Sequence, residues 1–309
     1  MSETLYDVLI IGGGPAGLTA GLYTSRARLK TLLVERMILG GQVMTTTMVE
    51  NYPGFPGGID GPDLMMRFQE HCQEFGLETI TGEVTGLVDK GREKIVAVDD
   101  REIRTRAVII TTGAEPSKLG IPGELEFTGR GVSYCATCDG AFFRNVPVAI
   151  IGGGDTAAEE ALFLSRFASK VYLVHRRDEL RATKVLQDRI FANDKIEPIW
   201  NSTVEQVVGD NTGVTSLILH NRQDDSQRTL EAVGMFVAVG VTPKAHFLAD
   251  ILELNAEGYI LTDSDCRTSI PGVFAAGDVR KKILKQIATA VGDGAIAAIV
   301  AEKYLDCME

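Results

Sequence analysis

The sequence has few of the residues that build metal sites and disulfide frameworks. It contains only four histidines and five cysteines in 309 residues. Cys72, Cys266 and Cys307 stand alone, and only Cys135 and Cys138 form a C-x-x-C pair. An odd number of cysteines with a single close pair is not a disulfide framework. A tetrahedral zinc site needs about four ligands, and no second C-x-x-C pair is present to complete one, so we expect no metal.

Positive charge and long apolar runs are also scarce. The chain has 31 Lys and Arg against 42 Asp and Glu, a formal net charge of -11, and such a field repels nucleic-acid phosphates and anionic lipids. The apolar run AIAAIVA is far shorter than the ~20 residues of a membrane span. The first residues are acidic rather than basic, unlike a signal peptide. We therefore expect a cytoplasmic protein without a nucleic-acid or membrane partner.

Glycine, in contrast, is abundant, and it concentrates in two matching segments. YDVLIIGGGPAGLTAGLYTSRARLKTLLVE (6–35) and VPVAIIGGGDTAAEEALFLSRFASKVYLVHR (146–176) each open with an apolar run, break at three glycines, continue with helical spacing and end in a second apolar run. This order predicts strand, tight turn, helix and strand. Two such units predict an α/β fold with two doubly wound, three-layer Rossmann-like nucleotide-binding domains.

The second glycine-rich unit is predicted to be inserted in the first. Strand-like residues give way to turn-forming residues near Glu115 to Lys118 and again near Thr242 to Lys244. We expect a discontinuous domain of residues 1–115 and 246–309 and an inserted domain of residues 116–245. A C-terminal helix is predicted from about Gly294 to Leu305.

The first glycine motif has the features of a dinucleotide site. Gly12 permits the tight turn, Gly14 lets the backbone approach a pyrophosphate, and Gly17 lets the helix pack on the strand. Glu35, at the end of the second strand, is positioned to accept a hydrogen bond from a ribose hydroxyl. The alternative is a glycine-rich turn with an incidental surface glutamate.

The second glycine motif points to a different nucleotide. Gly152, Gly154 and Ala157 repeat the three positions, but His175 occupies the place that corresponds to Glu35. Guanidinium groups nearby can bind a 2′-phosphate by charge-assisted, bidentate hydrogen bonds. We therefore predict NADP rather than NAD, unless the basic residues simply pair with Asp178 and Glu179 in a solvated turn. The basic residues are Arg176, Arg177 and Arg181.

Two different nucleotide sites imply one bound redox cofactor, for which FAD is the natural choice, and one exchangeable nicotinamide. The segment TSIPGVFAAGD places Asp278 where a ribityl hydroxyl of FAD could donate to it, although Asp278 could instead cap a helix. Cys135 and Cys138 are spaced to form a redox-active disulfide. Asp139 follows as a candidate proton donor and acceptor. An inert buried cysteine pair and a helix-capping Asp139 are the alternatives.

Together these motifs resemble those of the low-molecular-weight thioredoxin reductases. The matching segments are GGGPAG, GGQVMTTTMVENYPGF, CATCDG, GGGDTAAEEA, VHRRDELRA and TSIPGVFAAGD, followed by Lys285-Gln286. The resemblance implies a homodimeric flavoprotein that passes electrons from NADPH to FAD, to the Cys135–Cys138 disulfide and then to thioredoxin. It also implies that Cys138 lies against the flavin and that Cys135 attacks the disulfide of thioredoxin.

The resemblance completes the expected sites and reveals two departures. Lys285 stands where arginine is common, and Asp155 stands where asparagine is common, so that a negative charge beside the pyrophosphate should weaken NADPH binding. The expected FAD residues are Gly12, Gly14, Pro15, Ala16, Gly17, Glu35, Gly41, Gln42, Asn51, Gly113, Asp278, Lys285, Gln286 and Ile287. The expected NADPH residues are Gly152, Gly154, Asp155, Thr156, Ala157, His175, Arg176, Arg177 and Arg181.

Two other functions stay open at this point. The first is a related flavin reductase that serves another dithiol protein, glutaredoxin-like or peroxidase-linked. Reductases of peroxiredoxins carry an additional N-terminal thioredoxin-like portion, whereas this sequence opens with the first predicted strand, so we expect it not to be one of them. The second is a redox sensor whose flavin state controls the binding of a partner.

Overall fold

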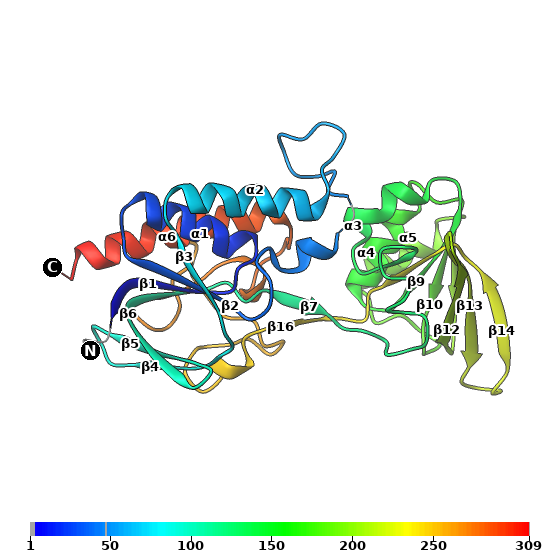
Figure 1. Ribbon diagram of the computed structural model, residues 1–309. Coiled ribbons are helices and arrows are strands. Elements are labelled where there is room, and N and C mark those ends of the chain that lie inside the picture. The colour runs from blue at the N-terminus through cyan, green and yellow to red at the C-terminus, as the bar shows by residue number, and fades with distance from the viewer. Residues whose placement is uncertain (1–3, 47, 309) are drawn as a thin grey trace. The chain divides into compact units, whose positions relative to one another are not determined.

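The computed structural model describes residues 4–46 and 48–308. Residues 1–3, on which part of the argument against a signal peptide rests, lie outside the described residues. The chain divides into two compact units, one of Met1–Glu115 with Thr242–Glu309 and the other of Pro116–Val241. We call them the first unit and the second unit and describe each by itself (Figure 1).

A seven-stranded sheet forms the centre of the first unit. Its strands are β1 (Leu5–Ile11), β2 (Thr31–Glu35), β3 (Glu78–Thr81), β4 (Val84–Asp89), β5 (Lys94–Val98), β6 (Arg101–Ile110) and β17 (Val273–Ala275). The order is β3-β2-β1-β6-β5-β4, with β17 also paired to β6. Strands β1, β2, β3, β6 and β17 are parallel, and β4 and β5 extend β6 as an antiparallel pair.

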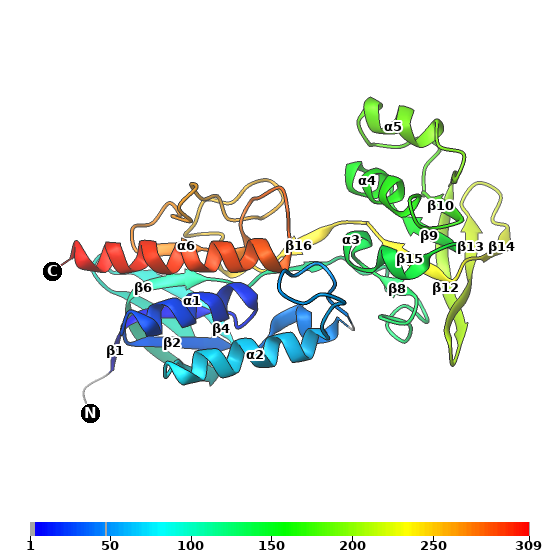
Figure 2. The same ribbon diagram turned by 90° about the horizontal axis from the view of Figure 1, so that it is seen from above.

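Three helices cover one face of this sheet, as both views show (Figures 1 and 2). Successive residues of a strand point to opposite faces, so Val8 and Ile10 of β1 pack with the helices while Leu9 and Ile11 pack with the C-terminal loops on the other face. The result is the three-layer arrangement of a nucleotide-binding domain. The helices are α1 (Pro15–Arg26), α2 (Gly61–Glu74) and α6 (Ile287–Asp306), and short helical turns are η1 (Gly41–Thr45), η3 (His246–Leu248) and η4 (Gly277–Val279).

The second unit repeats the plan with a five-stranded parallel sheet. The sheet contains β8 (Val132–Ser133), β9 (Pro147–Ile151), β10 (Lys170–Val174), β11 (Ile196–Ile199) and β15 (Gly234–Val237) in the order β11-β10-β9-β15-β8. One face packs against α4 (Asp155–Leu164) and α5 (Lys184–Phe191), and the other faces the antiparallel strands β12 (Ser202–Asp210), β13 (Gly213–Asn221) and β14 (Gln227–Glu231). Two short elements, α3 (Ala136–Asp139) and η2 (Gly140–Phe143), lie between β8 and β9.

The predicted α/β fold with two Rossmann-like domains is therefore confirmed. The chain passes between the units through β7 (Ala114–Pro116) and β16 (Val241–Pro243), which pair in a two-stranded sheet. The second passage lies at Val241 and Thr242, four residues before the predicted boundary at 245 and 246. The reason is that Ala245 and Leu248 are fully buried in the apolar core of the first unit.

The C-terminal helix also begins earlier than the sequence predicts. Helix α6 starts at Ile287 rather than near Gly294, and its first turn is closed by a capping box between Gln286 and Thr289. Gly294 does not break the helix, because it is the point where α6 approaches α1. A Cβ atom placed on Gly294 would lie 2.3 Å from the carbonyl oxygen of Ala16.

Two glycines on α6 provide a test of this packing. We expect Gly294→Ala to lower the free energy of unfolding by about 1–3 kcal/mol, because the methyl group overpacks the contact with α1. Gly292→Ala should instead raise it by up to about 1 kcal/mol, since nothing lies within 4 Å of a Cβ at that position. Thermal or denaturant unfolding measures both changes, and equal effects of the two substitutions would contradict the packing.

Candidate active site

The first glycine turn is built by close backbone contacts between β1 and α1. Gly12 has φ of +106°, and a Cβ on Gly17 would lie 1.9 Å from the carbonyl oxygen of Gly12, so neither position accepts a side chain. A Cβ on Gly14 would meet nothing within 4 Å. The peptide at Gly14 is therefore open on the side where a pyrophosphate would approach the start of α1.

Glu35 lies beside this turn and takes part in it. Its Oε2 accepts a hydrogen bond of 2.7 Å from the N–H of Gly13, and its Oε1 accepts one of 3.0 Å from the N–H of Met37. Glu35 is thus not an incidental surface residue. Its carboxylate holds the turn and remains half-buried at the end of β2.

Other predicted FAD residues gather around the same turn. A Cβ on Gly41 would lie 3.2 Å from Cα of Gly14, so the start of η1 packs on the turn. The side-chain amide of Gln42 donates to the carbonyl oxygen of Ala114, directly after Gly113. Asn51 lies with the start of α6 instead, where its amide donates to the side chain of Gln286 at 3.0 Å.

Asp278 reaches the site from the C-terminal segment. It lies inside η4 rather than at its cap, and a Cβ on the preceding Gly277 would lie 3.0 Å from Cβ of Ala16 in α1. Among the described residues, no donor forms a hydrogen bond to the buried Oδ1 of Asp278, although Lys282 Nζ lies 3.4 Å away. Burial raises the pKa of Asp278, and the charge of Lys282 opposes that rise. A buried acceptor without a hydrogen bond fits the hydroxyl-rich ribityl chain of FAD.

The remaining predicted FAD residues lie at or just before the start of α6 or at the start of α1. Gln286 caps the helix and Ile287 opens it. The ammonium of Lys285 lies 4.4 Å from the centre of the Tyr259 ring, in cation–π geometry. Pro15 and Ala16 open α1 beside the first glycine turn. This unit therefore offers a glycine turn, a carboxylate and a helix start, which suit a flavin dinucleotide.

The second glycine turn has the same form as the first. A Cβ on Gly152 would lie 2.7 Å from Cβ of Ala157, whereas a Cβ on Gly154 would meet nothing within 4 Å. Thr156 is exposed in the first turn of α4. Asp155, at the start of that helix, accepts a 2.6 Å hydrogen bond from the N–H of Thr183. Its carboxylate thus holds the segment before α5 against the start of α4.

The ring of His175 packs against the second glycine turn. The ring is buried, and a Cβ on Gly153 would lie 2.3 Å from its Cε1 atom. Burial lowers the pKa of His175, and the charges of Arg181, Arg177 and Arg176 lower it further, which favours the neutral form of the ring. Its Nε2 is buried and forms no hydrogen bond within the described part of the chain.

The three arginines are exposed around this turn. The N–H of Arg181 donates to the carbonyl oxygen of Gly153 at 2.7 Å, which places that arginine beside the glycines. In residues 4–46 and 48–308, none of the three guanidinium groups forms an ion pair, with Asp178 and Glu179 or with any other carboxylate. The cluster is therefore available to an anion such as a 2′-phosphate.

Cys135 and Cys138 form a disulfide in the second unit, with 5.3 Å between their Cα atoms. The first cysteine precedes α3 and the second lies within it, and both are half-buried. Asp139 follows, and its side chain does not cap η2, the alternative role considered for it. Burial raises the pKa of Asp139, as suits a group that must both hold and release a proton.

Ser133 links Asp139 to the disulfide, a connection that the sequence did not reveal. The backbone N–H of Cys135 donates to Ser133 Oγ at 3.1 Å, and the hydroxyl of Ser133 donates to Asp139 Oδ2 at 2.6 Å. Ser133 is itself buried. The serine thereby fixes the orientation of the carboxyl group beside the cysteines.

Glu160 is a second residue that sequence reasoning missed. It lies on α4, and the backbone N–H of Ala136, between the two cysteines, donates to its carboxyl group. Burial raises the pKa of Glu160 to about 7, and its Oε2 is buried without a hydrogen-bond partner among the described residues. A carboxyl group with a pKa near 7 thus accepts a hydrogen bond from the first residue of α3, the short helix that contains Cys138.

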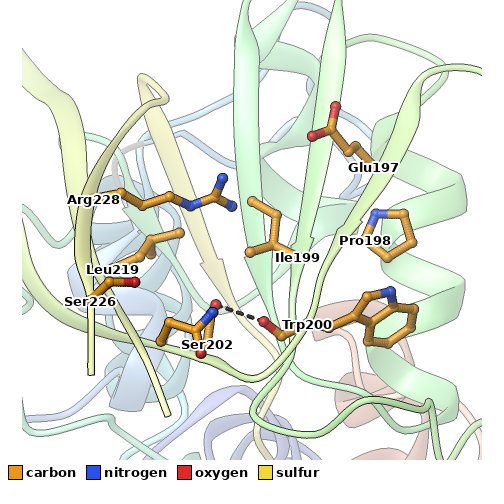
Figure 3. Close-up of a pocket in the computed structure, with 9 residues that line it drawn as sticks. Glu197, Pro198, Ile199, Trp200, Ser202, Leu219, Ser226 and Arg228 are labelled. Carbon is orange, nitrogen blue, oxygen red and sulfur yellow. Dashed lines mark hydrogen bonds between the residues drawn. The ribbon is translucent and has the colours of Figure 1, made fainter. Parts of the chain in front are cut away.

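A cavity elsewhere in the second unit takes no part in this arrangement. Figure 3 shows it beside β11, with Arg228 directed toward Ile199 and the hydroxyl of Ser202 bonded to the carbonyl oxygen of Trp200. Its volume is about 290 Å³, and none of the predicted site residues lines it. Among the described residues, no group of His, Cys, Asp and Glu could hold a metal ion, and no helix is long and apolar enough to cross a membrane.

Comparison with known proteins identifies the family. The family model for pyridine nucleotide-disulphide oxidoreductases matches residues 6–294. A thioredoxin reductase of Listeria innocua is 50% identical over 304 residues, which cover 98% of this chain and 95% of the relative. A thioredoxin reductase of Bacillus subtilis is 47% identical over 304 residues, 98% of this chain and 96% of the relative. The chain belongs to the thioredoxin reductase family.

The solved structures agree with this assignment. The crystal structure of thioredoxin reductase from Streptococcus pyogenes matches this chain with a TM-score of 0.95 and 47% identity, covering 99% of this chain and 100% of that chain. The resemblance noted in the motifs is thereby confirmed. Thioredoxin reductases use FAD and NADPH, and each unit of this chain carries one glycine turn of the kind that binds such a dinucleotide.

The titration of Glu160 gives a testable pH dependence of stability. Because the pKa of this buried acid rises from 4.5 to about 7 on folding, its contribution to stability is present below about pH 4.5 and is lost as the pH rises through about 7. The side chain of Glu160→Gln cannot ionise. The melting temperature of this variant relative to wild type should therefore increase by a few degrees between about pH 5 and pH 8, because 1 kcal/mol of stability shifts the melting temperature by about 2–4 °C.

The control for this prediction is Glu159→Gln, which changes the exposed neighbour on the same helix. The charge of Glu159 adds less than burial does to the rise in the pKa of Glu160, so the pH-dependent gain in this variant should be much smaller. If the two variants responded alike to pH, Glu160 would not be the buried acid that the geometry describes.

Proposed function

We propose that this chain is an NADPH-dependent thioredoxin-disulfide reductase. FAD binds to the first unit, at Gly12, Gly14, Glu35 and Asp278, and NADPH binds to the second unit. The observation that carries the proposal is the Cys135–Cys138 disulfide, which belongs to the same unit as a glycine turn with free arginines. The overall reaction consumes NADPH and a proton and converts the disulfide of thioredoxin into two thiols.

The residues of this chain have distinct roles in that reaction. Gly152, Gly154 and the start of α4 bind the pyrophosphate of NADPH, and the arginine cluster binds its 2′-phosphate. FAD, when bound, would supply the two-electron chemistry that couples oxidation of NADPH to reduction of a disulfide. The Cys135–Cys138 bond takes up the two electrons, and Asp139 supplies one proton to the thiol pair as that bond opens.

The cysteines then reduce the partner by thiol–disulfide exchange. One thiolate attacks the disulfide of thioredoxin and forms a mixed disulfide, and the second thiolate releases the reduced partner and restores the Cys135–Cys138 bond. Asp139, held by Ser133 at 2.6 Å, accepts or donates the proton at each exchange. The two electrons and one proton of the hydride from NADPH, together with one proton from solution, thus end on the two thiols of thioredoxin.

We further propose that the enzyme acts in the cytoplasm as a homodimer. The net charge of -11 is compatible with the cytoplasm, and the resemblance to low-molecular-weight thioredoxin reductases favours the dimer. Sedimentation of the purified protein tests the oligomeric state directly.

Replacing one active-site cysteine should separate the two halves of the reaction. We expect Cys138→Ser to keep FAD, to let NADPH reduce the flavin and to abolish thioredoxin reduction, because the serine cannot re-form a disulfide. Stopped-flow absorbance measures flavin reduction, and insulin-coupled turnover measures thioredoxin reduction. Cys307→Ser, which changes an exposed cysteine without a disulfide partner, should turn over like wild type. Thioredoxin turnover at the wild-type rate in Cys138→Ser would refute the assignment.

The arginine cluster should determine the choice of nicotinamide nucleotide. We expect the double variant Arg176→Ala with Arg177→Ala to raise KM for NADPH far more than KM for NADH, by about 1.5–3 kcal/mol for each charged hydrogen bond lost. Arg189→Ala, an exposed arginine on α5, serves as the control. Equal effects on the two nucleotides would mean that the cluster does not read the 2′-phosphate.

A further inference from the structure

Three charged side chains lie close to Asp278 in the first unit and form a group of four with it. Arg280 Nη1 donates to Asp293 Oδ1 at 2.9 Å, and Lys282 Nζ donates to Asp293 Oδ2 at 3.1 Å. Lys282 Nζ also lies 3.4 Å from Oδ1 of Asp278. We call Asp278, Arg280, Lys282 and Asp293 the charged quartet.

The quartet is largely removed from solvent. The side chains of Arg280, Lys282 and Asp293 are only 11–13% exposed. Burying ions is costly unless they are paired, and a buried ion pair is by itself weak evidence for stability. The two negative and two positive charges balance, yet Asp278 Oδ1 is left with an ion-pair contact and no hydrogen bond among the described residues. The arrangement thus keeps one acceptor atom available.

Asp293 also fixes the backbone that carries this acceptor. The N–H of Gly277 donates to Asp293 Oδ2 at 3.1 Å, and Gly277 adopts φ of +79° directly before Asp278. Lys282 is held in place in turn, because its ammonium also donates to Thr289 Oγ1 at 3.2 Å. Helix α6 therefore sets the position of both the ammonium and the turn.

We propose that Lys282 is a positioning residue for FAD: anchored by Asp293, it keeps the Asp278 carboxylate negatively charged and aimed so that it accepts a hydrogen bond from the ribityl chain. This inference rests on the proposed function, because it requires FAD at the first glycine turn. Lys282 itself acts only through Asp278.

The electrostatics around Asp278 support this role. Burial raises the pKa of Asp278. The charge of Lys282 and its side-chain contact with the carboxyl group lower this pKa, as does the charge of Lys285, and the charge of Asp293 raises it. Tyr259 completes the surroundings, and its own pKa is raised by burial and by the charge of Asp278. Lys282 contributes most to opposing the effect of burial on the pKa of Asp278. Removal of Lys282 therefore favours the protonated carboxyl group of Asp278, which is a weaker hydrogen-bond acceptor for a hydroxyl than the carboxylate.

The pH dependence of FAD binding separates this role from simple bracing of the fold. The experiment dilutes the purified holoenzyme and measures the dissociation constant of FAD by flavin fluorescence between about pH 6.5 and pH 9. For Lys282→Met we expect the dissociation constant at neutral pH to rise at least about tenfold, and the loss to shrink toward pH 9 as Asp278 ionises. Wild type should change little over the same range.

Three further variants make the test specific. Lys281→Met removes the neighbouring lysine, whose side chain is 57% exposed, and should bind FAD like wild type. Lys282→Arg keeps the charge and should restore the flat pH profile. Lys282→Gln removes the charge but keeps a donor toward Asp293, so it should reproduce the pH-dependent loss even if Lys282→Met does not fold.

Two results would overturn the inference. One is unchanged FAD binding in both Lys282→Met and Lys282→Gln, and the other is a loss of the same size at every pH, which is the mark of a bracing role. Wild-type protein that binds no FAD would instead refute the proposed function. In an Asp278→Asn background, Lys282→Met should add no pH-dependent loss, because the group that titrates is gone.

Discussion

The structure depends most on the close backbone contact at each glycine turn. In the first unit, α1 approaches β1 so closely that a Cβ on Gly17 would lie 1.9 Å from the carbonyl oxygen of Gly12. In the second unit, a Cβ on Gly152 would lie 2.5 Å from the carbonyl oxygen of Ala238 and 2.7 Å from Cβ of Ala157. In both turns the third glycine, Gly14 or Gly154, has open space beside it, so an anion can approach the start of the helix there. The distinct chemistry of the two sites comes from the residues that surround this common frame.

Those surrounding residues differ in charge. Beside the first turn, Glu35 binds the N–H of Gly13 at 2.7 Å, and the charged quartet lies nearby with no net charge. Beside the second turn, the buried ring of His175 packs against Gly153, and the exposed arginine cluster forms no ion pair with a carboxylate among the described residues. A carboxylate suits the hydroxyls of FAD, whereas unpaired guanidinium groups suit the extra phosphate of NADPH. The two turns are therefore similar in backbone and different in ligand.

Local sequence patterns predicted the strands, turns and helices that build both units, because glycine spacing and apolar periodicity act over a few residues. Contacts between distant segments left no such pattern. The bond from Thr183 to Asp155 spans 28 residues, and the burial of Glu160 behind the cysteine helix depends on tertiary packing. For the same reason the start of α6 was misplaced, since Gly294 is a packing residue and not a helix breaker. Ser133 lies only two residues before Cys135, but a serine at that spacing does not by itself predict a hydrogen bond to Asp139.

The central claim is that the Cys135–Cys138 disulfide exchanges electrons with a bound flavin. Anaerobic titration of the purified protein with NADPH, followed by flavin absorbance, tests it most directly. If the claim holds, complete reduction requires two equivalents of NADPH per chain, one for FAD and one for the disulfide, and oxidised thioredoxin then restores the flavin spectrum. Complete reduction by a single equivalent, with no recovery on addition of thioredoxin, would contradict it.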